Sequence, residues 1–121
     1  MATKKTLVIG ASTNPARYSY LAMEKLKRYG HPIVAVGRNA ESINGTDILP
    51  GMPTLDGIDT VTLYINPEVQ KAYTDWIISL HPKRIIFNPG TENDELEQLA
   101  KSNGINTLEA CTLVLLGTGQ Y

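Results

Sequence analysis

Cysteine, histidine and net charge are all scarce in this sequence of 121 residues, and each shortage excludes a class of protein. The one cysteine, Cys111, cannot form an internal disulfide, and Cys111, His31 and His81 lack the spacing of metal ligands. A formal net charge of −1 argues against nucleic acid as the main partner, because domains that bind nucleic acid are usually basic. The first apolar run spans only residues 7–9, which is too short for a signal peptide or a membrane helix. We therefore expect a soluble cytoplasmic protein with no metal and no membrane contact.

Length and composition predict one domain, residues 1–121, built around a single core. Hydrophobic residues make up 42% of the chain and charged residues 19%, which is ordinary for a globular domain and sufficient for one core. No repeat, low-complexity tract or linker divides the sequence.

Short apolar runs rich in β-branched residues alternate with stretches of helical period. The predicted strands are Thr6–Ile9, Pro32–Val36, Thr60–Ile65, Arg84–Phe87 and Ile105–Leu108. Helices are predicted over residues 18–29, 67–80 and 92–102, with a short one over 113–116, whereas residues 37–57 are predicted to be mostly loop. This alternation predicts a small doubly wound α/β domain with a mostly parallel five-stranded sheet and helices on both faces.

The loop after the first predicted strand is suited to an anion. Ligands of such sheets bind beyond the carboxyl ends of the strands, where backbone N–H groups and a helix start can hold a phosphate. Gly10 gives the tight turn, and Ser12 is small and offers a hydroxyl. Asn14 is expected to cap the helix, Pro15 to occupy its first turn, and Arg17 to reach over the loop. The alternative is a plain turn with a surface arginine, since Ser12 and Pro15 replace two glycines of the usual dinucleotide fingerprint.

The loop after the second predicted strand carries a second cation. It reads Gly37-Arg38-Asn39, and its nearest acidic residue is Glu41. A protein that binds NAD usually places a carboxylate here for the ribose hydroxyls. An arginine instead favours a ligand with an extra phosphate on the ribose, as in NADP or coenzyme A. The alternative is an exposed loop arginine.

Two further turns are expected to line the same crevice. They are Asn66-Pro67 after the third predicted strand and Asn88-Pro89-Gly90 after the fourth, while Tyr64 and Ile65 are placed to flank a flat base. Capping and turn chemistry would explain Asn66, Pro67, Asn88 and Gly90 equally well.

No catalytic residue is assigned from the sequence. Cys111 follows the last predicted strand, but a free cysteine is more often a small buried hydrophobe than a nucleophile. His31 and His81 look like turn residues, and Tyr73 and Trp76 fall on the apolar face of a predicted helix, in the core.

Motifs along most of the chain resemble a known family. They are Gly10-Ala11-Ser12-x-x-Pro15-x-Arg17-x-Ser19, Leu26-x-x-x-Gly30, Gly45, Ile58-Asp59-x-Val61 and Glu109-x-Cys111. Their order resembles the stand-alone CoA-binding domain proteins, which are similar to the N-terminal domain of the succinyl-CoA synthetase alpha subunit. The loop Val36-Gly37-Arg38 departs from the Val-Asn-Pro that is common in relatives.

The resemblance implies a Rossmann-like fold that binds coenzyme A. By that analogy Gly10, Ala11, Ser12 and Arg17 take the pyrophosphate. Arg38 takes or neighbours the 3′-phosphate, residues 64–67 border the adenine, and the pantetheine runs over residues 88–91. Synthetase activity is not implied, because the chain has no room for the second domain that carries it. We therefore expect a small-molecule ligand, CoA or an acyl-CoA, and no catalysis by this chain itself.

Two other interpretations remain open at this stage. One is a small NADP-dependent reductase or CoA-dependent transferase with Cys111 near the reacting end of the ligand. The other is a homo-oligomerising module with a vestigial nucleotide site, whose subunit contact would use exposed residues 113–116 and Tyr121.

Overall fold

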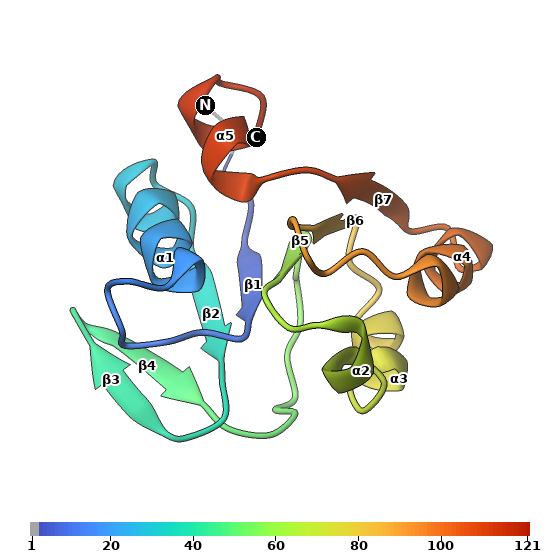
Figure 1. Ribbon diagram of the computed structural model, residues 1–121, viewed down its shortest axis with the longest axis horizontal. Helices are drawn as coiled ribbons and strands as arrows, with labels where there is room; N and C mark the ends of the chain where they lie inside the picture. Colours follow the sequence, from blue (N-terminus) through green and yellow to red (C-terminus); the bar gives the residue numbers. More distant parts are fainter. Residues whose placement is uncertain (1–2) are drawn as a thin grey trace.

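A computed structural model describes residues 3–121 as one α/β unit (Figure 1). Its strands are β1 (Thr6–Ile9), β2 (Ile33–Val36), β3 (Glu41–Ile43), β4 (Thr46–Leu49), β5 (Thr60–Leu63), β6 (Arg84–Phe87) and β7 (Asn106–Glu109). Its helices are α1 (Tyr18–Arg28), α2 (Pro67–Gln70), α3 (Thr74–Ser79), α4 (Asp94–Ser102) and α5 (Thr112–Gly117). No helix within residues 3–121 is both long enough and apolar enough to cross a membrane.

β1 lies at the centre of a seven-stranded sheet with the order β3-β4-β2-β1-β5-β6-β7. Every neighbouring pair is parallel except β3 and β4. The chain passes from β1 outward to β2 and the β3–β4 pair, then returns to place β5 on the other side of β1 (Figure 1). The carboxyl ends of β1 and β5 therefore form the switch point, where doubly wound sheets bind their ligands.

The predicted mostly parallel sheet is confirmed, but the predicted count of five strands is wrong. The two extra strands, β3 and β4, form an antiparallel hairpin within the region predicted to be loop. Asn44 and Gly45 join them with φ values of 51° and 79°. Two consecutive positive φ angles are what a tight hairpin turn requires, and Asn-Gly adopts them most readily. β4 then pairs in parallel with β2, so the hairpin extends the sheet.

Two apolar clusters fix the helices on opposite faces of the sheet. Leu7 and Ile9 of β1 belong to one cluster with Ile77 of α3, whereas Val8 belongs to the other with Leu26 of α1. Side chains alternate along a strand, so one central strand supports both layers. Helices α3 and α4 cover the first face, and α1 and α5 cover the second (Figure 1). Each such buried aliphatic side chain contributes about 1.5–3 kcal/mol.

The single helix predicted over residues 67–80 is two short helices. The amides of Lys71, Ala72 and Tyr73 bond to carbonyls three residues back, so this segment tightens into turns between α2 and α3. The hydroxyl of Thr74 also donates to the carbonyl of Gln70 at 3.0 Å, which occupies a carbonyl at this break.

Candidate functional site

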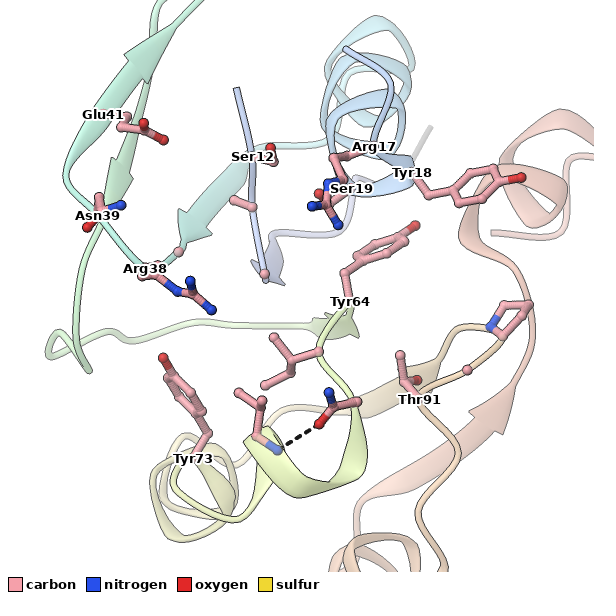
Figure 2. Close-up of a pocket in the computed structure, with 18 of the residues that line it drawn as sticks. Ser12, Arg17, Tyr18, Ser19, Arg38, Asn39, Glu41, Tyr64, Tyr73 and Thr91 are labelled. Atoms are coloured by element: carbon pink, nitrogen blue, oxygen red, sulfur yellow. Dashed lines mark hydrogen bonds between the residues drawn. The ribbon is translucent and has the colours of Figure 1, made fainter. Parts of the chain in front are cut away.

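A cavity of about 850 Å³ opens at the carboxyl ends of β1, β2, β5 and β6 (Figure 2). The predicted residues that line it are Gly10, Ala11, Ser12, Arg17, Gly37, Arg38, Tyr64, Asn66 and Gly90. The predicted residues Asn14, Pro15, Pro67 and Asn88 are not among its lining. Loops from four strands thus meet at the switch point, as the sequence predicts.

The turn after β1 is held in place by its own amides. The N–H groups of Gly10 and Ala11 both donate to the carbonyl of Val36, at 2.9 and 3.0 Å. Gly10 has φ +93°, and a Cβ at this position would lie 2.7 Å from the carbonyl oxygen of Tyr64. Glycine is therefore needed both for the backbone angle and for the close approach of β5. The amides of Gly10 and Ala11 tie β1 to β2, so they are not free to bind a phosphate.

The rest of this loop is shaped by two side chains. The amide of Asn14 donates to Ser12 Oγ, and the amide of Ala16 donates to Asn14 Oδ1, both at 3.0 Å. Asn14 therefore shapes the loop, and the prediction that it caps the helix is wrong, as is the placement of Pro15 within the first turn. The helix begins later, at Tyr18. Within residues 3–121 the amides of Ser12 and Thr13 have no acceptor.

The start of α1 offers further unpaired donors to the cavity. Arg17 is the N-cap residue, and no side chain caps this end of the helix. The amides of Tyr18, Ser19 and Tyr20 accordingly have no acceptor within the described residues. Figure 2 shows Arg17 projecting from this helix end beside the cavity. Unpaired amides, the positive end of the helix and a guanidinium together favour an anion.

The loop after β2 brings a second arginine from the opposite wall. A Cβ on Gly37 would lie 2.8 Å from the carbonyl oxygen of Ala11, so only glycine allows this loop to pass so close. The exposed side chain of Arg38 then points into the cavity (Figure 2). Glu41 lies on the same side, at the start of β3.

The turns after β5 and β6 serve the fold as well as the cavity. Asn66 lines the cavity and caps α2, since its Oδ1 accepts from the amide of Val69 at 2.9 Å, with Pro67 as the first helical residue. Asn88 is 2% exposed and bridges β5 and α5 beneath the cavity. Its Nδ2 donates to Thr62 Oγ1 at 2.7 Å, and its Oδ1 accepts from the amide of Thr112 at 2.9 Å. The side-chain amide of Asn88 is thus buried and bonded within the fold, and it does not face the cavity.

Tyr64 combines a cavity-lining ring with a buried hydroxyl. The hydroxyl has no hydrogen-bond partner among the described residues. Burial raises the pKa of this phenol well above its usual value, so it stays protonated at neutral pH. Cys111, which precedes α5, is half-buried and does not line the cavity.

Several lining residues were not predicted as site residues. They are Tyr18, Ser19, Asn39, Glu41, Gly51, Val69 and Tyr73, whereas the lining residues Ile65, Pro89 and Thr91 fall within the segments expected to border the ligand. Tyr73 packs against the core, as predicted, but also reaches the cavity wall. No group of three or more potential metal ligands occurs in the described part of the chain.

The surface expected for self-association is largely covered. Leu116 is 1% exposed, and the ring of Tyr121 lies 4.4 Å from the guanidinium of Arg84. Among the apolar side chains of residues 113–116, only Val114 is strongly exposed, at 59%.

The fold and the cavity define a class: small doubly wound α/β domains with an anion-suited cavity at the switch point of the sheet. Residues 4–117 match the CoA binding domain family. The chain belongs to that family, which confirms the resemblance recognised from its motifs.

Solved structures share this fold over nearly all of the chain. A crystal structure of an uncharacterized protein is 50% identical, with a TM-score of 0.97 and 100% coverage of both chains. A hypothetical protein from Pyrococcus horikoshii OT3 is 25% identical, with a TM-score of 0.84 over 93% of this chain and 80% of that one. The dinucleotide-forming acetyl-coenzyme A synthetase 1 of Ca. Korarchaeum cryptofilum shares the fold at 20% identity, with a TM-score of 0.71 over 88% of this chain and 25% of that one. No match is found among curated proteins.

Proposed function

We propose that this protein binds coenzyme A or an acyl-CoA in the cavity and catalyses no reaction itself. The observation that carries the proposal is the pair of arginines, Arg17 and Arg38, on opposite walls of one cavity. Neither forms an ion pair within residues 3–121. Coenzyme A carries two separate phosphate groups, a pyrophosphate and a 3′-phosphate, which match two separate cations.

The orientation of the ligand follows from where the donors lie. The free amide of Ser12, the start of α1 and Arg17, which all line the cavity, take the pyrophosphate. Arg38 takes the 3′-phosphate, and Ile65 and Asn66 border the adenine. The pantetheine then leaves over residues 89–91, where the cavity wall continues.

The side chains that could act as nucleophile or base lie away from the cavity, so we propose that this chain does not catalyse a reaction. His31 precedes β2 and His81 precedes β6, so both lie at the amino ends of parallel strands. The cavity is at the opposite, carboxyl ends, and Cys111 is outside its lining. No nucleophile–base pair therefore faces the bound ligand within the described residues.

Calorimetry with four ligands tests the proposal. We expect CoA to bind about tenfold or more tightly than dephospho-CoA, because the latter lacks the phosphate that Arg38 would hold. NAD and NADP should bind more weakly than CoA. In the variant Arg38→Ala, CoA and dephospho-CoA should bind with similar affinity.

Three results would contradict parts of this proposal. Equal binding of CoA and dephospho-CoA by the unaltered protein would remove the role of Arg38. If NADP bound most tightly of the four ligands, the cavity would be a site for NADP and not for CoA. No heat and no thermal stabilisation with CoA at millimolar concentration would overturn the proposed function.

A further inference from the structure

Ser19 is a buried polar residue with no role in the fold. It is the second residue of α1 and is 4% exposed, yet it lines the cavity. Its hydroxyl makes no hydrogen bond within residues 3–121 and is not one of their fully buried unpaired atoms, so it opens onto the cavity. Figure 2 shows Ser19 and Arg17 together at the helix end that borders the cavity.

A hydroxyl on a cavity wall bonds to water before a ligand enters, and a ligand group that displaces this water must offer a hydrogen bond in its place. The only open direction around Ser19 is the cavity. The amides of Tyr18, Ser19 and Tyr20 at the start of the helix likewise have no acceptor in the described chain. A partner for the hydroxyl, which can donate or accept, therefore enters from the cavity.

We propose that the Ser19 hydroxyl is a further ligand-binding group, which donates to the same phosphate that the start of α1 and Arg17 hold. This inference rests on the proposed function of the cavity. The phosphate nearest α1 is then held by the Ser19 hydroxyl, three amides at the start of the helix and the Arg17 guanidinium.

The neighbours of Ser19 select a phosphate over other parts of the ligand. The groups at this end of the cavity include several donors: the amides at the helix start, the amide of Ser12 and the guanidinium of Arg17. The carboxylate that lines the cavity, Glu41, lies on the far side beyond Arg38 (Figure 2). Only a group with several acceptor oxygens and negative charge matches this set of donors.

The variant Ser19→Ala tests the assignment with two readouts. Alanine fits the space of serine and favours a helix, so the thermal midpoint of the free protein should not fall. The affinity for CoA should fall about tenfold, because the lost hydrogen bond is made to a charged group. The control Ser42→Ala removes an exposed hydroxyl from β3, outside the cavity, and should change neither quantity.

The outcomes separate this inference from the proposed function. If the unaltered protein binds CoA and Ser19→Ala binds it equally well, Ser19 is not a ligand group and the proposed function stands. If Ser19→Ala lowers the thermal midpoint of the free protein, the hydroxyl has an internal structural role and the inference is wrong. If the unaltered protein binds neither CoA nor inorganic pyrophosphate, both fail together.

Discussion

Backbone amides in the loop after β1 are divided between two tasks. Those of Gly10 and Ala11 hold β1 against β2 through the Val36 carbonyl, and those of Ser12 and Thr13 remain free. The unpaired amides of the loop therefore start two residues later than a glycine-rich fingerprint suggests. Arg17, the N-cap residue before the helix, adds a positive charge at the same place.

Replacing Arg17 by alanine should weaken CoA binding by about 1.5–3 kcal/mol, the range for a hydrogen bond to a charged group. Arg17 is exposed and unpaired within the described chain, so folding stability should change little. Titration calorimetry measures the loss. The matched control is Arg28→Ala, an exposed arginine in the last turn of the same helix. An affinity unchanged in Arg17→Ala, or lowered equally in the control, would exclude Arg17 from the site.

At the residue scale the sequence predicts loops better than it predicts side-chain directions. Gly10, Arg17 and Arg38 could be placed because they follow strands whose carboxyl ends meet. Asn88 has the same position in the sequence pattern, yet its amide turns inward to Thr62 and Thr112. The sequence carries no sign of that inward turn. In the sequence Ser19 is named only as part of a family motif. Its place in the cavity wall is not predicted, because that place depends on how α1 packs.

The β3–β4 hairpin shows, at the scale of elements, which secondary structure the sequence does not predict. Five strands are predictable because they are short runs rich in apolar and β-branched residues between helical stretches. β3 has three residues, of which the first two are exposed and polar and the third is half-buried, so it gives no comparable run. Its signal is the turn, Asn44-Gly45, which has a recognisable two-residue hairpin sequence. The helix predicted over residues 67–80 fails for a different reason, because its break lies in backbone bonding around Gln70 that apolar spacing does not register.

Gly45→Ala should destabilise the protein by about 1–2 kcal/mol, the cost of placing an L-residue in left-handed backbone. Gly45 has φ +79°, and a Cβ there would meet no neighbour within 4 Å, so the cost comes from the backbone alone. Urea denaturation measures the change. The control Gly117→Ala lies in α5, where an added Cβ meets only the flexible end of Lys25, and should not destabilise comparably. Equal stability of Gly45→Ala and the unaltered protein would argue against the turn.

Across the whole molecule, the segment before β1 is joined to the end of α5 and the residues that follow it. Tyr121 places its hydroxyl 2.6 Å from Thr6 Oγ1, and its ring contacts both Arg84 and His31. His31 Nδ1 in turn accepts the amide of Lys4 at 3.0 Å. The cluster closes the amino-end side of the sheet, opposite the cavity, so it stabilises the fold without touching the candidate site.

This cluster predicts a pH dependence of stability. Burial, followed by the charges of Lys4 and Arg84, lowers the pKa of His31 below its usual 6.5, and protonation would also remove the acceptor for the Lys4 amide. The unfolded chain therefore binds the proton more tightly, and stability falls as the pH drops from about 6.5 through the lower folded-state pKa. Thermal midpoints between pH 7.5 and 5.5 measure the slope. His31→Asn keeps an acceptor but does not titrate, so its slope over this range should be smaller, and an identical slope would contradict the assignment.

Neither edge strand of the sheet is well suited to pairing with a strand of another chain. One is β3, three residues long and led by Glu41, and the other is β7, which ends in Glu109. Short, charged outer strands resist the strand-by-strand addition that begins fibre growth. The hairpin that frames one wall of the cavity therefore also protects the protein against aggregation, and concentrated solutions should remain clear without a partner to cover either edge strand.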